Sequence, residues 1–292
     1  MSVAADIEAF EAQRPRLTRL AYRMLGSVSE AEDVVQDAWL RWTRTQDEVL
    51  DPAGWLVRVT SRICIDRMRS AKAQREAYRG PWLPEPLIEE LNVDPVERAE
   101  DVSVAFLLAL ERLSPLERAV FLLHDVFDED YGSVAETLGR NEAAVRQLAA
   151  RARAHVRDNR PRFSVSQEDA AKLAAAFMMA ASQGDMAALS SVLAQDAMMV
   201  TDGGGKRKAS LRPLIGREDI IRLLEGIAWR AGGDEEAWPL SFRAVRINGY
   251  PGIVMERDDG PMTVAFQPGE DGKLAAIYMV RNPDKLGHVS AG

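Results

Sequence analysis

The chain has 292 residues, of which 47% are hydrophobic and 28% are charged, values typical of a globular protein with two or three domains and a sizeable core. No stretch reaches the roughly 18–20 uncharged apolar residues that a membrane span needs, and the acidic, helical N-terminal pattern is not that of a signal peptide. One cysteine, Cys64, and three scattered histidines argue against an internal disulfide and against a zinc site. We therefore expect a cytoplasmic protein that holds no metal or other cofactor.

The net charge of −8 is unevenly distributed along the chain. Residues 55–80 and residues 139–163 each contain seven Lys/Arg and two acids, whereas residues 81–101 contain one Arg and seven acids. Two basic segments on an acidic chain indicate two separate contacts with a polyanion. Two solvated helix faces would give the same pattern, so charge alone leaves both explanations open.

Hydrophobic periodicity predicts that the chain is helical up to about residue 163. Ser29 with Glu32 forms the pattern of a capping box, Asp51-Pro52 and Ser114-Pro115 are typical helix starts, and Gly26 ends the first helix. The predicted helices span residues 6–25, 29–44, 51–79, 95–112, 115–127, 131–138 and 141–158.

Between these helices lies an acidic, proline-rich linker, predicted over residues 81–101. Its start, GPWLPEPLIEELNVDP at residues 80–95, places Trp82 and Leu83 among prolines, which keep a backbone extended. A simple tether is rich in Gly and Ser instead. The apolar side chains of this linker are therefore expected to contact another part of the protein.

The region after residue 163 has a different pattern. It predicts helices at 167–183, 185–193 and 217–231, a short strand at 197–204, and four strands at 240–247, 251–257, 261–267 and 273–281. Helices followed by an antiparallel meander describe a separate α+β domain.

The segment YGSVAETLGRNEAAVRQLAARAR, residues 131–153, has the pattern of a helix-turn-helix. Ala135 is small enough for two crossing helices, Gly139 permits the tight turn, and Val145 and Leu148 are placed to face inward. The side chains left facing outward suit base edges and phosphates in the major groove. They include Arg140, Asn141, Glu142, Arg146, Gln147, Arg151 and Arg153. A plain αα-hairpin with a basic surface is the alternative.

Two N-terminal helices carry weaker signals. The helix over 29–44 has an apolar stripe of Val34, Val35, Ala38 and Trp39 beside an acidic and polar flank. The helix that follows mixes Trp55 and small hydroxyls, Thr60 and Ser61, with basic residues, a combination that suits melted nucleic acid. A solvated basic helix with a core tryptophan is the alternative for this second helix.

Together, LTRLAYRMLGSVSEAEDVVQDAWLRW, AGWLVRVTSRICIDRMRS and the helix-turn-helix resemble the extracytoplasmic-function (ECF) sigma factors of the sigma-70 family. The resemblance covers roughly residues 8–158. It implies sigma region 2 over residues 1–80 and sigma region 4 over 102–163. The implied partners are promoter DNA and core RNA polymerase, which would bind through its β′ clamp and β flap. The free protein is expected to be a monomer.

The resemblance also implies a role for particular residues. The β′ clamp would bind Asp33, Gln36, Asp37 and Trp39. The promoter −10 element would contact Trp55, Arg58, Arg62, Asp66, Arg69 and Lys72, and the −35 element would contact the outward residues between Arg140 and Arg153. Many members of the family have Asn at the position of Arg62, which leaves the base preference at −10 open.

Three further motifs resemble the subgroup of ECF sigma factors that carry a fused SnoaL-like domain, with the nuclear-transport-factor-two-like fold, here residues 164–292. They are WLPEP (Trp82, Leu83, Pro84, Glu85, Pro86), DGGGK (Asp202, Gly203, Gly204, Gly205, Lys206) and NPDKL (Asn282, Pro283, Asp284, Lys285, Leu286). The resemblance implies that the fused domain replaces a separate anti-sigma factor. On the residues alone, DGGGK reads as an exposed loop with a charge at each end, and Trp82 as an anchor for a groove. The alternatives are a flexible turn, a Trp82 packed on region 2, and a simple C-terminal tail.

SnoaL-like folds form an apolar pocket, which raises the possibility of an enzyme or of a ligand sensor. His288 is the only histidine beyond residue 163, so no acid–base pair can be selected, and we predict that the protein is not an enzyme. A small ligand could contact Phe177, Met178, Met179, Met198, Met199 and Trp229, although core packing explains these residues better. The prediction is an alternative sigma factor regulated by its fused domain. The alternative is a one-component regulator that binds DNA through the helix-turn-helix and senses a ligand.

Overall fold

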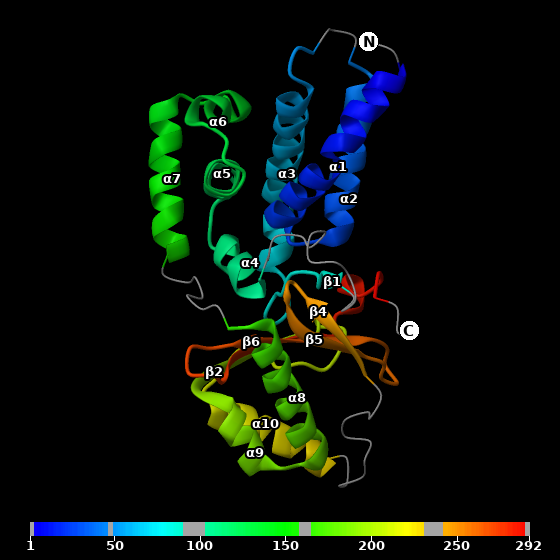
Figure 1. Ribbon diagram of the computed structural model, residues 1–292, viewed down its shortest axis with the longest axis vertical. Coiled ribbons are helices and arrows are strands. Elements are labelled where there is room, and N and C mark those ends of the chain that lie inside the picture. The colour runs from blue at the N-terminus through cyan, green and yellow to red at the C-terminus, as the bar shows by residue number, and fades with distance from the viewer. Residues whose placement is uncertain (1–2, 46–48, 90–102, 158–164, 231–241, 290–292) are drawn as a thin grey trace. The chain divides into compact units, whose positions relative to one another are not determined.

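The computed structural model describes residues 3–45, 49–89, 103–157, 165–230 and 242–289 (Figure 1). It divides into two compact units. The helical unit contains residues 1–77 and 105–160, and the C-terminal unit contains residues 78–104 and 161–292. The first part of the predicted linker thus belongs to the C-terminal unit, while its acidic residues 90–101 lie outside the described residues. Within the described ranges, no helix is both long and apolar enough to cross a membrane.

The helical unit begins with a three-helix bundle in which α1 packs along both α2 and α3. Its core contains Phe10, Leu17 and Leu20, which recur on one face of α1 as predicted. The second helix starts earlier than predicted. Ser27, and not Ser29, is its N-cap, because the Ser27 hydroxyl accepts a hydrogen bond from the Glu30 N–H (3.1 Å). The bounds are α1 Val3–Leu25, α2 Val28–Thr43 and α3 Pro52–Glu76.

The second half of the helical unit is centred on a buried arginine, Arg118. Its guanidinium donates to the carbonyls of Met24 (2.7 Å) and Leu110 (2.9 Å) and pairs with Glu111 (2.7 Å). It therefore joins the end of α1 to α4 and α5. The predicted helix 115–127 is divided between α5 and a π-helical turn, η2. The bounds are α4 Val104–Glu111, α5 Pro115–Val120, η2 Phe121–Val126, α6 Tyr131–Leu138 and α7 Glu142–Arg157.

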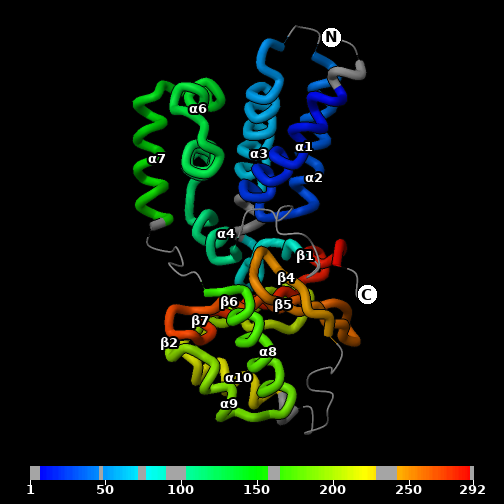
Figure 2. The backbone as a smooth tube through the Cα atoms, in the orientation of Figure 1, coloured from blue at the N-terminus to red at the C-terminus, as the bar shows by residue number. Residues whose placement is uncertain are grey.

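The C-terminal unit is a seven-stranded mixed sheet in the order β1-β4-β5-β6-β7-β2-β3. Strands β4 to β7 form the predicted antiparallel meander, and β2 pairs with β7 in parallel. Three helices, α8, α9 and α10, lie on one face of this sheet (Figure 2). The bounds are α8 Gln167–Gln183, α9 Met186–Val192, β2 Leu193–Asp202, β3 Leu214–Ile215, α10 Arg217–Arg230, β4 Arg243–Ile247, β5 Tyr250–Met255, β6 Met262–Pro268, β7 Leu274–Val280 and η4 Pro283–Lys285.

The core of the C-terminal unit lies between the sheet and its helices. The ring of Phe177 from α8 packs on that of Phe266 from β6, with centroids 5.4 Å apart. Met178 and Met199 are buried in the same cluster, whereas Met179 is exposed. Core packing thus accounts for Phe177, Met178 and Met199, three of the six apolar residues considered as pocket candidates. The Trp229 side chain lies outside the described residues.

The linker supplies the edge strand of this sheet, β1, Ile88–Glu89. It pairs antiparallel with β4, with Ile88 opposite Ile247. Just before it, the Leu87 N–H donates to the Asn248 side chain (3.2 Å), and the Asn248 N–H donates to the Leu87 carbonyl (2.9 Å). Asn248 has a left-handed φ of +52°, a conformation that asparagine tolerates better than most residues. This turn therefore also holds the linker.

Candidate functional site

The helix-turn-helix has the geometry that its sequence predicts. Gly139 adopts a left-handed conformation (φ 60°, ψ 43°) and ends α6, while the Arg140 N–H donates to the Ala135 carbonyl (2.9 Å). Val145 and Leu148 are buried against the rest of the unit. The face of α7 opposite these residues is exposed, and it carries Glu142, Arg146 and Gln147, with Asn141 exposed just before the helix.

Several polar residues of α7 already have partners within the helical unit. The Asn141 side chain caps α7 by accepting from the Ala144 N–H (2.8 Å). Arg146 pairs with Glu142 (3.0 Å), and its guanidinium lies 4.4 Å from the centre of the Tyr131 ring. These contacts hold the Arg146 side chain over the exposed face of the motif.

The two arginines further along α7 also form ion pairs within the helical unit. Arg153 pairs with Asp125 (2.6 Å) and donates to the Tyr131 hydroxyl (3.1 Å), while Arg151 pairs with Glu117 (2.9 Å). Burial alone would raise the pKa of Glu117, but hydrogen bonds from Ser114 and Arg151 outweigh it, so that the pKa is lowered. Contact of either arginine with DNA phosphate would have to compete with these ion pairs.

Two of the α3 residues predicted to contact the −10 element, Arg58 and Arg62, contact the end of α6. Arg62 donates to the carbonyls of Thr137 (2.9 Å) and Glu136 (3.3 Å), and Arg58 lies 3.4 Å from the Glu136 carboxylate. A cation is favourable at these carbonyls because they belong to the C-terminal end of a helix. Trp55 packs against Trp42.

The remaining α3 residues divide between exposed and buried positions. Asp66 and Arg69 are exposed and lie 3.5 Å apart, and the Lys72 side chain is outside the described residues. Thr60 and Ser61 are buried, with exposed fractions of 0% and 1%. The sequence grouped these two hydroxyls with the basic residues, but they do not share the exposed surface of those residues, because that side of α3 packs into the bundle.

The acidic flank of α2 is joined to α3 by Arg67, which the sequence did not single out. Arg67 donates to Asp37 (2.8 Å) and lies 3.7 Å from Asp33. Gln36 is exposed, whereas Trp39 is half-buried against Phe10. The four residues predicted to bind the β′ clamp therefore lie on one helix, and both carboxylates have a neighbouring cation.

A buried carboxylate, Asp202, organises the contacts between the linker and the C-terminal unit. Its Oδ1 accepts hydrogen bonds from the Tyr78 hydroxyl (2.5 Å) and the Gly204 N–H (2.9 Å). Its Oδ2 accepts from the Leu83 N–H (2.9 Å) and the Lys285 ammonium (2.7 Å). Asp202 is fully buried, so the prediction of an exposed charge at this end of the DGGGK loop is wrong.

Asp202, Lys285 and the residues around them form a group that we call the linker clasp: Tyr78, Trp82, Leu83, Asp202, Asn282 and Lys285. Lys285, like Asp202, contacts several members of this group. Its ammonium also donates to the Leu83 carbonyl and lies 4.2 Å from the centre of the Trp82 ring. Asn282 donates to the Tyr78 hydroxyl (2.8 Å). Burial, and then the hydrogen bond to Asp202, raise the pKa of Tyr78, which keeps this hydroxyl protonated.

The clasp brings together residues of all three motifs, WLPEP, DGGGK and NPDKL. Gly204 has a φ of +60°, and a Cβ there would come within 2.4 Å of the Asn282 side chain, so this position requires glycine. Lys206 and Asp284 form an exposed ion pair of 2.6 Å. The other members of the motifs lie around this centre. Pro84, Glu85, Pro86, Gly203 and Leu286 are buried, Gly205 is exposed, and Pro283 begins η4.

Sequence reasoning missed three residues that hold the linker. Tyr78 was assigned to the end of a helix, Asn248 to a simple turn and His288 to the chain end. The His288 ring donates to the Pro86 carbonyl (2.9 Å). Of the three, only Asn248 could be noticed from the sequence, because asparagine-glycine is a turn pattern. That pattern predicts a turn but not that Asn248 binds the linker.

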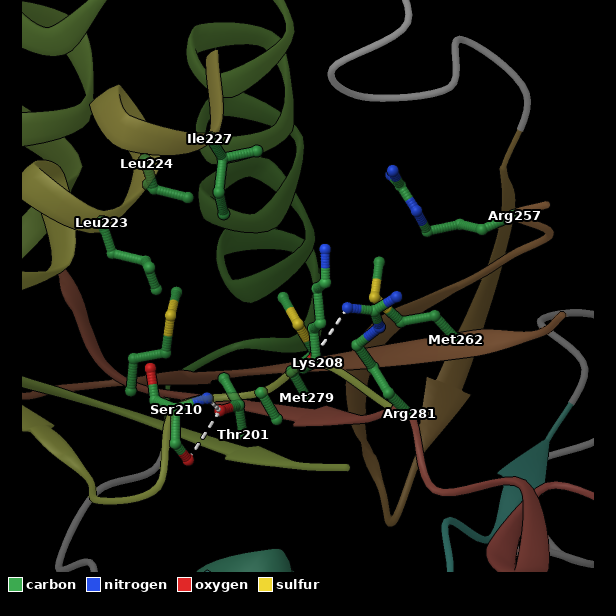
Figure 3. Close-up of a pocket in the computed structure, with 12 residues that line it drawn as sticks. Thr201, Lys208, Ser210, Leu223, Leu224, Ile227, Arg257, Met262, Met279 and Arg281 are labelled. Carbon is green, nitrogen blue, oxygen red and sulfur yellow. Dashed lines mark hydrogen bonds between the residues drawn. The ribbon is translucent and has the colours of Figure 1, made fainter. Parts of the chain in front are cut away.

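The C-terminal unit also contains a cavity of about 300 Å³ (Figure 3). Met199 lines it, but the described lining residues include no carboxylate and no histidine that could exchange protons with a substrate. Across the described residues, no group of three or more His, Cys, Asp or Glu is placed to hold a metal ion.

Comparisons with known proteins agree with this architecture. The Sigma-70 region 2 family matches residues 9–74 and the Sigma-70, region 4 family matches residues 103–156. The ECF RNA polymerase sigma factor SigJ of Mycobacterium tuberculosis (strain ATCC 25618 / H37Rv) is 38% identical over 291 residues, which are 96% of this chain and 93% of SigJ. A probable ECF RNA polymerase sigma factor, SigI of M. tuberculosis (strain CDC 1551 / Oshkosh), is 39% identical over 191 residues, 63% of this chain and 66% of SigI.

A solved structure extends the likeness to the whole fold. The crystal structure of M. tuberculosis SigJ superposes with a TM-score of 0.77 at 35% sequence identity, covering 96% of this chain and 98% of that one. Helical sigma domains followed by an α+β C-terminal domain are therefore confirmed as the fold. Sigma factors act with RNA polymerase and promoter DNA. The chain belongs to the extracytoplasmic-function RNA polymerase sigma factors of the sigma-70 family, and it is an alternative sigma factor.

Proposed function

We propose that this sigma factor directs core RNA polymerase to a subset of promoters and that its C-terminal unit regulates it by holding the linker between its two DNA-binding regions. Residues 1–80 would act as region 2, residues 102–163 as region 4 and residues 164–292 as the regulatory domain. The observation that carries the regulatory part is the buried Asp202 carboxylate, which accepts hydrogen bonds from Tyr78, just before the linker, and from Leu83 within it.

Recognition of the −35 element is assigned to α7 and to the turn before it. Arg146 and Gln147 are exposed on the face opposite the buried Val145 and Leu148. Arginine pairs with guanine and glutamine with adenine in the major groove, so these two side chains would read bases. Arg140 is exposed at the turn and would contact phosphate. Region 4 would also bind the β flap of the polymerase.

Binding of the −10 element is assigned to α3, and binding of the β′ clamp to α2. Arg58 and Arg62 are bound to the end of α6, and Asp33 and Asp37 are beside Arg67. DNA and polymerase would have to replace these internal contacts. This competition supports a free protein that binds promoter DNA weakly until the polymerase separates its regions.

The clasp would control how far the two regions can move apart. The segment from Tyr78 to Glu89 is fixed to the C-terminal unit by the clasp, by the Asn248 contacts and by strand β1. Release of this segment would lengthen the free chain between α3 and α4, and the reach of a tether grows with its length. The C-terminal unit would thereby limit the distance between the two DNA-binding regions, and release of the linker from it would remove that limit.

Run-off transcription with core polymerase tests the proposal, with the full chain compared with versions ending at residue 163 and at residue 281. Loss of residues 282–292 removes Asn282 and Lys285, so we expect a changed level of transcription from an unchanged start site. Transcription that is the same for all three versions would reject regulation by the C-terminal unit. Sequence-specific DNA binding without polymerase, and no transcription with it, would instead support a one-component regulator.

A further inference from the structure

The cavity of the C-terminal unit has two chemically different sides (Figure 3). Leu223, Leu224 and Ile227 project from α10 on one side. Lys208, Arg257 and Arg281 lie on the other side. The remaining lining residues come from the sheet and from the loop after β2, and they are Met199, Thr201, Ala209, Ser210, Met262 and Met279.

The apolar side is suited to a hydrocarbon group. Three aliphatic side chains of α10 line the cavity together with three methionine side chains, one each from β2, β6 and β7. Methionine is flexible and polarizable, so such walls adapt to differently shaped apolar ligands. The Thr201 hydroxyl is engaged by Ser210, whose N–H donates to it (2.8 Å), so this polar group does not need a ligand partner.

The polar side is cationic. The described lining residues include no carboxylate, and Asp259, which pairs with Arg281 (2.7 Å), does not line the cavity. The Arg281 guanidinium also donates to the Lys208 carbonyl (2.6 Å). Its Nε–H is nevertheless buried and has no acceptor within the described part of the chain. A buried donor without an acceptor is unfavourable, and an anionic group supplied by a ligand would remove that penalty.

We propose that this cavity binds an amphipathic organic anion, with its hydrocarbon part against α10 and its carboxylate at Lys208, Arg257 and Arg281. At about 300 Å³ the cavity is at the small end of ligand pockets, which suits a single medium-length chain and excludes a large cofactor. This binding site is independent of promoter recognition, since every lining residue that the structure describes belongs to the C-terminal unit.

The cavity borders the linker clasp through the backbone. Thr201 lines the cavity and Asp202, the next residue, centres the clasp. Arg281 lines the cavity, and the N–H groups of Arg281 and Asn282 both donate to the Asp202 carbonyl (2.7 and 3.0 Å). A ligand that contacts Arg281 therefore acts one residue away from the groups that hold the linker.

Isothermal titration calorimetry of the full chain tests the proposal with three probes: decanoate, decan-1-ol and acetate. We expect one decanoate per chain, binding about tenfold more tightly than decan-1-ol because only the acid forms charge-assisted hydrogen bonds. Acetate lacks the hydrocarbon part and should show no saturable binding. No polymerase is present, so the result does not depend on whether the protein supports transcription.

Two double variants distinguish binding by the cations of the cavity from a general effect of the protein's charge on decanoate binding. Lys208→Gln with Arg257→Gln should weaken decanoate binding to the level of decan-1-ol and leave decan-1-ol unaffected. Lys172→Gln with Arg222→Gln removes two cations that do not line the cavity and should change nothing. Circular dichroism verifies that the variants are folded. Lys208 is exposed, so Lys208→Gln alone should leave the fold intact and cause a smaller loss of decanoate affinity than the double variant. Any of four results would overturn the proposal. They are no saturable binding of decanoate, several decanoates bound per chain, equal affinities for decanoate and decan-1-ol, and an equal loss of decanoate affinity in both double variants.

Discussion

The Asp202 carboxylate lies 2.7 Å from the Lys285 ammonium inside the C-terminal unit, and 83 positions separate the two residues in sequence. Both side chains are buried. A buried ion pair loses the hydration of both charges and is favourable only when further hydrogen bonds satisfy them. The linker and Tyr78, which lies just before it, supply these bonds: the Tyr78 hydroxyl and the Leu83 N–H donate to Asp202, and the Leu83 carbonyl accepts from Lys285. The linker is thus part of the environment that makes this ion pair stable.

Replacement of Asp202 should release the linker. In Asp202→Ala, Lys285 would be a buried charge without its carboxylate, and breaking such a pair typically costs about 3–5 kcal/mol. The Leu83 N–H would also lose its acceptor. Hydrogen exchange measured by mass spectrometry should show faster exchange for peptides that contain Leu83, and urea should unfold the C-terminal unit at a lower concentration.

The exposed ion pair of Lys206 and Asp284 provides the control. Both side chains are more than half exposed, at 56% and 59%, although their distance of 2.6 Å is as short as that of the buried pair. Exposed pairs contribute about 0–1 kcal/mol. Asp284→Ala should therefore leave exchange at Leu83 nearly unchanged. If it accelerated that exchange as much as Asp202→Ala does, burial of Asp202 would not be what holds the linker.

The clasp should weaken at high pH because of Tyr78. Burial and the bond to Asp202 raise its pKa above the ordinary value of 10.0, so the folded state retains a proton that the unfolded state loses. The contribution of Tyr78 to stability is then fully present below pH 10 and falls as the pH rises above it. Urea unfolding of wild type and Tyr78→Phe, compared between about pH 8 and pH 11, should show a steeper loss for wild type. Parallel curves would mean that Tyr78 is no more protonated in the folded state than in the unfolded one.

Local patterns predicted much of this structure. Gly139, followed by inward-facing Val145 and Leu148, indicated the helix-turn-helix, because the requirements of a tight turn and a buried helix face are local. The meander was equally visible, since each hairpin has its own turn residues. The three motifs of the clasp were identified through family resemblance and not through their chemistry.

Long-range contacts could not be predicted in this way. Nothing near Asp202 in sequence indicates that Lys285 will neutralise it, so the aspartate reads as an exposed loop residue. The burial of Arg118 depends on the Met24 carbonyl, which lies 94 positions earlier. The parallel pairing of β2 with β7 and the addition of β1 at the sheet edge likewise join distant segments. Periodicity reports which face of an element is buried but not which element covers it.

Arg118 should determine the stability of the helical unit. Its exposed fraction is 1%, and its guanidinium satisfies two carbonyls and pairs with Glu111. Arg118→Ala would leave these buried acceptors without a donor, and losing one partner of a buried pair costs about 3–5 kcal/mol. Thermal unfolding followed by circular dichroism should show a lower midpoint. The exposed neighbour Arg112, replaced by alanine, is the control, and an equal loss in that variant would exclude a special role for Arg118.

Base recognition at the −35 element should depend on different side chains from phosphate binding. A library of promoters with random −35 sequences, transcribed by the holoenzyme, identifies the preferred bases. Arg146→Ala and Gln147→Ala should each relax the preference at one position by about 1–3 kcal/mol, because each removes contacts to one base edge.

Arg140→Gln is the matched comparison on phosphate. Arg140 is preferred over Arg153 because the latter is already paired with Asp125 and Tyr131. Holoenzyme affinity for the selected promoter should fall by a similar factor on every sequence, and the slope of log affinity against log salt should become shallower by about one. The opposite result would be that Arg146→Ala, Gln147→Ala and Arg140→Gln each lower the affinity by the same factor on every promoter sequence. It would show that α7 binds the DNA backbone and does not read its bases.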